Sequence, residues 1–140
     1  MASDEEDENN KSLLIKIEYQ GVSALMTGDI SAEGEAAVLE RYQQNGSTNT
    51  DAGNILHCDI LKVGHHGSKY STSESFLSAV APSIAVIQVG AHNMYGHPTP
   101  EVLERLDSFA IPVWRNDWNG AIGIDLCKGH VKEVMTMIKP

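Results

Sequence analysis

Positive charge and cysteine are both scarce in this 140-residue sequence. Ten lysines and arginines stand against nineteen aspartates and glutamates, which gives a formal net charge of −9. Such a chain lacks the basic stripe of a nucleic-acid-binding module, so a polyanionic ligand would need a metal or a small basic patch. The two cysteines, Cys58 and Cys127, lie far apart and form no ligand spacing, which favours buried free thiols over a metal or redox pair.

Long apolar runs are also missing. No stretch approaches the roughly 18 consecutive apolar residues that a membrane-spanning helix needs, and the acidic start of the chain does not resemble a secretory signal. The acidic residues 4–8 account for more than half of the net charge. This composition predicts a disordered acidic arm over residues 1–11, followed by an α/β domain, or part of one, over residues 12–140.

The remaining sequence alternates between strand-like and helix-like patterns. Apolar runs bounded by turn residues predict strands at 12–19, 22–27, 59–63, 84–89, 112–114, 121–126 and 130–138. Capping residues and helical spacing predict helices at 31–42, 74–81 and 100–109, and a turn is expected at 116–120. In the first strand, Leu14, Ile15 and Ile17 are the expected core residues. The order predicts an α/β fold in which helices flank a mixed β-sheet.

Candidate chemistry lies where three of these strands end. Asp29, the pair His65-His66 and His97 each occur in the loop that follows a predicted strand. Loops at the carboxyl ends of strands carry the binding groups of open α/β sheets. Taken alone, Asp29 is better explained as an anion at a helix N-terminus, and the histidine pair equally well as a surface turn. Together they favour a metal-linked site, because carboxylate plus imidazole suits zinc, manganese or iron.

Three motifs match a known family. Residues 27–29 (TGD), 62–68 (KVGHHGS) and 95–98 (YGHP) occur within a similarity that runs from about residue 9 to residue 126. The sequence resembles the metallo-β-lactamase fold, and more narrowly the C-terminal hydrolase domain of ComEC-type DNA-uptake proteins and its free-standing relatives. The resemblance implies metal-dependent hydrolysis of a phosphodiester, with a nucleic acid as substrate and zinc or manganese as the metal.

The resemblance also implies roles for individual residues. Asp29 matches an aspartate that bridges two metals, where it would also orient the attacking water. His65 matches the final histidine ligand. His66, Ser68 and His97 match positions suited to holding a phosphate oxygen, and His97 could also act as general acid.

The sequence departs from the family in one respect, because the H-x-H-x-D-H metal-binding loop is absent. The chain is therefore expected to correspond to the C-terminal half of an αββα sandwich, with most ligands supplied elsewhere. One hypothesis is an incomplete hydrolase that works with its missing N-terminal half. The other is a catalytically inactive half-domain that associates with a partner or forms a homodimer. Its exposed apolar residues would then include Ile15, Ile17, Val86 and Ile122.

Three residues near these loops leave alternatives open. Tyr95 is expected either to be structural or to cover a substrate, and His92 either to lie at the surface or to approach His97. Trp118 is expected to pack near the closing turn. A nucleic-acid-binding module without chemistry is disfavoured, since the sequence has neither a basic stripe nor a series of stacking aromatics.

Overall fold

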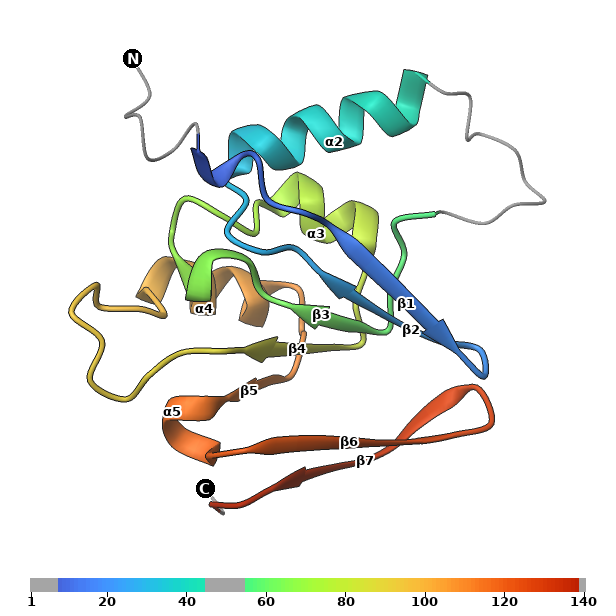
Figure 1. Ribbon diagram of the computed structural model, residues 1–140, viewed down its shortest axis with the longest axis vertical. Coiled ribbons are helices and arrows are strands. Elements are labelled where there is room, and N and C mark those ends of the chain that lie inside the picture. The colour runs from blue at the N-terminus through green and yellow to red at the C-terminus, as the bar shows by residue number, and fades with distance from the viewer. Residues whose placement is uncertain (1–7, 45–54, 139–140) are drawn as a thin grey trace.

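The computed structural model describes residues 8–44 and 55–138 (Figure 1). Its strands are β1 (Ile15–Tyr19), β2 (Val22–Met26), β3 (Ile60–Lys62), β4 (Ile84–Ile87), β5 (Val113–Arg115), β6 (Ile122–Cys127) and β7 (His130–Thr136). Its helices are α2 (Ala32–Gln44), α3 (Glu74–Val80), α4 (Pro100–Ser108) and the one-turn α5 (Asn116–Asn119), and the short 3₁₀ turn η1 (Gly64–Gly67) follows β3. The predicted elements are therefore present, with α5 at the predicted turn.

Five strands form one mixed sheet in the order β1-β2-β3-β4-β5. β1 and β2 pair antiparallel as a hairpin, whereas β2, β3, β4 and β5 run parallel to one another. β6 and β7 pair with each other as a separate antiparallel hairpin, below the main sheet in Figure 1. The predicted α/β class, a mixed sheet flanked by helices, is confirmed.

One face of the main sheet carries the hydrophobic core. Leu25, Leu61 and Ala85 are neighbours in register on β2, β3 and β4, and all three are buried. Helices α3 and α4 add Phe76, Leu77, Val80, Val102 and Leu106 to the same cluster. Each large apolar side chain buried in this way contributes about 1.5–3 kcal/mol to folding. The core thereby fixes the strands whose ends form the candidate site.

The other face of the sheet is apolar and is open over β1 and β2, whereas Ile84 on the same face of β4 is buried. Ile15, Met26, Lys62 and Val86 are neighbours in register across β1 to β4, and Trp114 follows on β5. Of these, Ile15 and Met26 are exposed, and Val86 is half-buried. Because this row alternates with the row facing the helices, its side chains lie on the side away from the core.

The outer strand β1 shows the consequence of that arrangement. Ile15 and Ile17 are 43% and 49% exposed. The prediction that they belong to the core is wrong, because an alternating strand does not indicate which of its two faces is covered. Their expected exposure in a half-domain is confirmed, whereas Val86 and Ile122, also expected to be exposed, are half-buried. We call Ile15, Ile17 and Met26 the open sheet face.

Residues 8–12 hold the start of α2. The amides of Lys11 and Ser12 donate to the carbonyls of Glu8 and Asn9, each at 3.0 Å. The Asn10 Oδ1 accepts from the Ser31 hydroxyl at 2.6 Å. The last residues of the predicted acidic arm thus form a turn, while residues 1–7 lie outside the described residues and their disorder stays a prediction.

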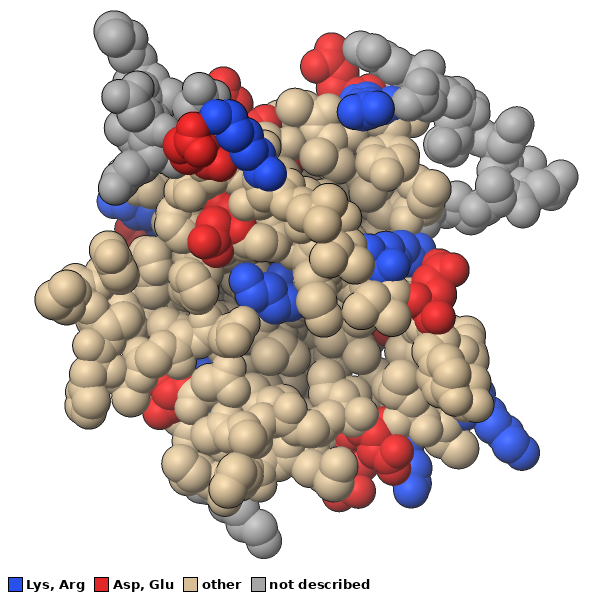
Figure 2. Space-filling model, viewed as in Figure 1, with Lys and Arg blue, Asp and Glu red and all other residues tan. Residues whose placement is uncertain are grey.

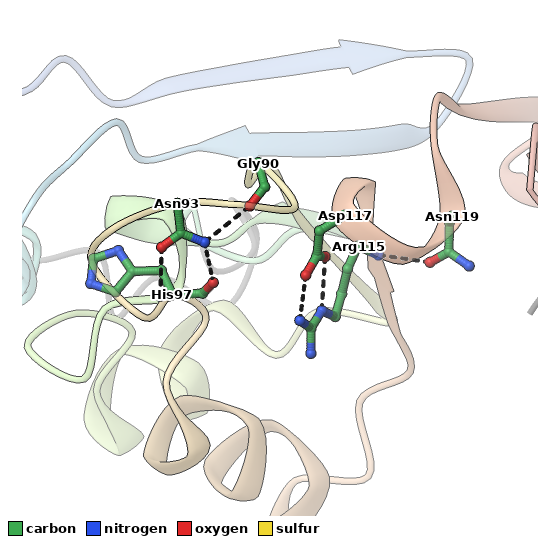
Figure 3. A network of polar contacts seen from close by, with 6 residues as sticks. All are labelled: Gly90, Asn93, His97, Arg115, Asp117 and Asn119. Carbon is green, nitrogen blue, oxygen red and sulfur yellow. Dashed lines mark hydrogen bonds and ion pairs between the residues drawn. The ribbon is translucent and has the colours of Figure 1, made fainter.

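The α5 turn is closed by polar side chains (Figure 3). The Asn119 Oδ1 accepts from the Arg115 amide at 2.9 Å, and the Arg115 guanidinium donates to both carboxylate oxygens of Asp117. Trp118 packs under that guanidinium, whose central carbon lies 3.8 Å from the ring centroid, yet Trp118 remains 64% exposed. Its predicted packing is therefore against Arg115 and not in the core.

A buried carboxylate joins α2 to the segment before α3. Glu35 is fully buried and accepts hydrogen bonds from the backbone amides of Thr72 and Ser73. The Arg105 guanidinium donates to the carbonyls of Ser71 and Thr72, both at 2.9 Å. Burial raises the pKa of the Glu35 carboxyl, and the hydrogen bonds and the Arg105 charge oppose that rise. Three elements, α2, α3 and α4, thus meet at residues 71–73.

Replacing Glu35 with alanine should destabilise the fold by about 2–4 kcal/mol, because the buried Thr72 amide and the half-buried Ser73 amide lose their acceptor and a cavity remains. Glu33→Ala is the matched control, since Glu33 lies exposed in the same first turn of α2. Urea unfolding of the three proteins measures the difference. Equal stability of Glu35→Ala and Glu33→Ala would contradict the role assigned to Glu35.

The two cysteines should differ sharply in reactivity. Cys58 is fully buried, and burial raises the pKa of its thiol to about 11, whereas Cys127 is half-buried. A shift of this size lowers the thiolate population on the order of a hundredfold. Iodoacetamide at mildly alkaline pH should therefore label Cys127 first, and Cys58 only after urea is added, as peptide mass spectrometry would show. Labelling of both at one rate in the folded chain would refute this.

Candidate functional site

Three loops at one edge of the sheet bring the sequence-predicted residues together. β2, β3 and β4 are parallel, so the loops after them meet at their common carboxyl end. Asp29 follows β2, His65 and His66 lie in η1 after β3, and His97 lies in the loop between β4 and α4. The His66 Nε2 is 3.6 Å from the Asp29 Oδ1, and the rings of His65 and His97 have centroids 5.7 Å apart.

The η1 turn holds both histidines in an uncommon backbone conformation. His65 and His66 have φ values of 45° and 53°, in the left-handed region that non-glycine residues seldom adopt. The conformation is fixed by the His65 amide, which donates to the Gly28 carbonyl, and by the Ser71 hydroxyl, which donates to the Gly64 carbonyl. Strained backbone of this kind gathers at functional sites, where the surroundings impose it.

The β2 loop is shaped to let Asp29 reach the site. Gly28 has a φ of 58°, and a Cβ added there would lie 3.0 Å from the Ser12 Cβ. The Ser12 hydroxyl accepts from the Asp29 amide at 3.0 Å. The glycine of the TGD motif is thus required by a close approach of two chain segments, which leaves the Asp29 carboxylate half-exposed beside His66.

His66 is oriented by a backbone carbonyl. Its Nδ1 lies 2.7 Å from the Gln88 carbonyl, which can only accept, so Nδ1 carries a proton. The other nitrogen, Nε2, then faces the Asp29 carboxylate. An imidazole nitrogen and a carboxylate oxygen at this separation can both donate an electron pair to one cation. A carbonyl holding the far nitrogen is also how metal-ligating histidines are positioned.

His97 is held by an asparagine that the sequence does not mark (Figure 3). The Asn93 Oδ1 accepts from the His97 amide at 2.9 Å, and its Nδ2 donates to the carbonyls of Gly90 and His97. The His97 ring also stacks on Tyr95, with centroids 5.8 Å apart. Burial, together with the nearby His65 and His66, lowers the pKa of His97 and so favours its neutral form.

A pocket of about 550 Å³ opens among these loops. It is lined by Glu8, Asn9, His65, Ser68, Tyr70, Tyr95 and His97. Ser68, predicted to hold a phosphate oxygen, is buried, and its hydroxyl accepts from the Tyr70 amide at 3.3 Å. Three of the predicted residues, His65, Ser68 and His97, thus share the pocket, while Asp29 and His66 pair beside it. His92 is exposed and is not among the lining residues.

Lys62 is a cation near Asp29 that was not predicted from the sequence. The Lys62 Nζ lies 3.4 Å from the Gly28 carbonyl. Burial lowers the pKa of Lys62, and the neighbouring Asp29 charge opposes that decrease. Lys62 could have been predicted from the motif KVGHHGS. It stands two residues before the loop that carries the histidines, and therefore near the same end of the sheet.

The donors of this chain do not fit a complete metal centre. Across residues 8–44 and 55–138, no group of three or more His, Cys, Asp and Glu side chains is placed to hold a metal ion. Asp29 and His66 supply two donors, and the ring of His65 faces His97 instead. Two donors beside a lysine form at most part of a ligand set, so no reaction step can be derived through a metal held by these residues alone.

The described part of the chain contains no helix with the length and hydrophobicity needed to cross a bilayer.

No family model matches the sequence. Curated proteins do resemble it. ComE operon protein 3 of Bacillus subtilis (strain 168) is 40% identical over 121 residues, which is 86% of this chain and 14% of that protein.

Two further relatives extend the similarity. Competence protein ComA of Neisseria gonorrhoeae is 36% identical over 126 residues, 90% of this chain and 17% of that protein. Recombination protein 2 of Haemophilus influenzae is 30% identical over 135 residues, 95% of this chain and 16% of that protein. The chain is thus homologous, over nearly its whole length, to a segment of each of these three proteins, and it spans less than a fifth of their length.

Proposed function

We propose that this chain contributes one half of a metal-dependent phosphodiesterase site, of the metallo-β-lactamase type, that acts on DNA during uptake. The observation that carries the proposal is the pair of Asp29 and His66, whose carboxylate oxygen and imidazole nitrogen lie 3.6 Å apart and could both bind one cation. The shared pocket of His65, Ser68 and His97 supports it, as do the homologous competence-type proteins. Zinc or manganese is the proposed metal.

The roles proposed for these residues follow from their positions. A metal held in such a site would acidify a bound water and polarise the phosphodiester. Asp29 supplies a carboxylate ligand, and His65 or His66 an imidazole ligand. The Ser68 hydroxyl and the His97 ring hold phosphate oxygens at the pocket. An anionic phosphate beside His97 raises its pKa again, so that this ring can carry the proton that a leaving oxygen needs.

The remaining ligands have to come from outside the described residues, because these supply too few donors. The second candidate function is therefore a half-domain that is inactive alone and associates with another segment, a partner or a second copy. The open sheet face favours it, since Ile15 and Ile17 expose apolar surface on an outer strand. In either case the isolated chain should show negligible phosphodiesterase activity.

Metal binding to the purified chain tests the first proposal. We expect weak binding of one Mn²⁺ or Zn²⁺ in calorimetry, and about tenfold or greater loss of affinity in Asp29→Asn, because a two-donor site cannot spare one. His66→Ala and His65→Ala identify which imidazole binds. His130→Ala is the control, since His130 is exposed at the start of β7.

Two outcomes would count against the proposed half-site. Affinity that is unchanged in Asp29→Asn and in both histidine variants would remove the metal proposal. Tight binding of two metals per chain, with phosphodiester turnover that Asp29→Ala abolishes, would show that the site is complete in this chain.

Light scattering tests the half-domain. The wild-type chain should self-associate at high concentration, and Ile17→Lys should weaken that association by about tenfold or more, because a charge would have to be buried in an apolar contact. Met94→Lys is the control, since Met94 is exposed but lies in the β4–α4 loop, away from the open sheet face. A monomer at all concentrations, or equal effects of the two variants, would refute self-association through this face.

A further inference from the structure

Two tyrosine rings stand exposed at the rim of the site pocket. Tyr70 and Tyr95 are 57% and 79% exposed, and both line the pocket that contains Ser68 and His97. They come from different loops, since Tyr70 follows η1 and Tyr95 lies between β4 and α4. Only 6% of the sequence is aromatic, so the exposure of two tyrosines beside one pocket points to a use other than core packing.

The Tyr70 backbone is tied to α2 and the Tyr95 ring stacks on His97, while both rings keep exposed surface. The Tyr70 carbonyl accepts from the Ala32 amide at 2.7 Å, which ties this residue to the start of α2. Tyr95 stacks on the His97 ring with an interplanar angle of 30°, and the Asn93 side chain holds the backbone of His97. The surface that each ring leaves exposed is available to a flat ligand that stacks on it.

The charges around the rings exclude a purely electrostatic mode of binding. The Lys69 Nζ lies 5.1 Å from the Tyr70 ring centroid, whereas Glu8, which lines the same pocket, forms an ion pair with Lys11. On the face drawn in Figure 2, lysine and arginine side chains stand apart from one another and alternate with acidic ones. Without a basic stripe, a nucleic acid would need another source of binding energy than its phosphates.

We propose that Tyr70 and Tyr95 form a stacking subsite for the unpaired bases of single-stranded DNA. This subsite rests on the proposed phosphodiesterase function, because the bases would be held at the pocket that Ser68 and His97 also line. The pocket volume of about 550 Å³ falls within the usual range for small-ligand sites. Duplex DNA is excluded as the preferred ligand, since its bases already stack on one another and their faces are not free.

Fluorescence anisotropy with a labelled oligothymidylate, in metal-free buffer at low salt, tests the subsite. Tyr70→Ala and Tyr95→Ala should each weaken binding by about five- to a hundredfold, which corresponds to one stacked base. Tyr95→Phe should retain the affinity, because the ring remains. Tyr19→Ala is the matched control, since Tyr19 is also exposed but lies on β1, away from the pocket.

The same measurement with an abasic oligomer and with a duplex completes the test. Binding of the abasic oligomer should be weak and unaffected by the tyrosine variants, and the duplex should bind more weakly than the single strand. The proposal is overturned by no binding of the single strand to the wild-type chain, or by equal losses for abasic and normal oligomers. It is also overturned if the variants alter self-association in light scattering and leave oligonucleotide binding unchanged. Neither tyrosine enters the metal measurement, so the two proposals can fail independently.

Discussion

The backbone of η1 joins the loops of the site. The His65 amide donates to the Gly28 carbonyl after β2, and the Gly67 carbonyl accepts from the Thr99 amide before α4. A Cβ added at Gly67 would lie 2.5 Å from the Pro98 Cβ, so a larger residue there would push the β4–α4 loop away. These contacts are made by main-chain groups. The path of the backbone therefore fixes where the side chains of the site lie.

The site carries little net positive charge with which to bind a polyanionic ligand. Asp29 is an anion, and its neighbouring cation, Lys62, already lies within reach of the Gly28 carbonyl. The imidazole of His97 tends towards its neutral form. A phosphodiester placed here would meet hydrogen-bond donors but little net positive charge. Positive charge supplied from elsewhere would therefore decide whether the anion binds, which makes binding and the completion of the site interdependent.

Some features could be predicted from the sequence, and others could not. The positions of Asp29, His65 and His97 at one edge follow from strand periodicity and from the shared direction of parallel strands. The exposure of Ile15 and Ile17 did not follow from periodicity, since alternation does not tell which face is covered. The role of Asn93 could not be predicted from the sequence, because its side chain forms hydrogen bonds only with the backbone of its own loop. Nor does a histidine pair in the sequence reveal the left-handed φ angles of His65 and His66.

Tyr70 and Tyr95, at the rim of the pocket, are attached to the rest of the structure in different ways. Tyr70 is bonded through its carbonyl to the start of α2, and α2 is in turn bonded through Glu35 to the next residues of the same segment, Thr72 and Ser73. Tyr95 belongs to a loop whose shape depends on the amide of Asn93. One wall of the pocket is therefore bonded to a helix and the other belongs to a loop. Bases stacked at these two rings, as proposed, would be recognised by their flat faces, which all bases share, so the subsite would accept a strand without selecting its sequence.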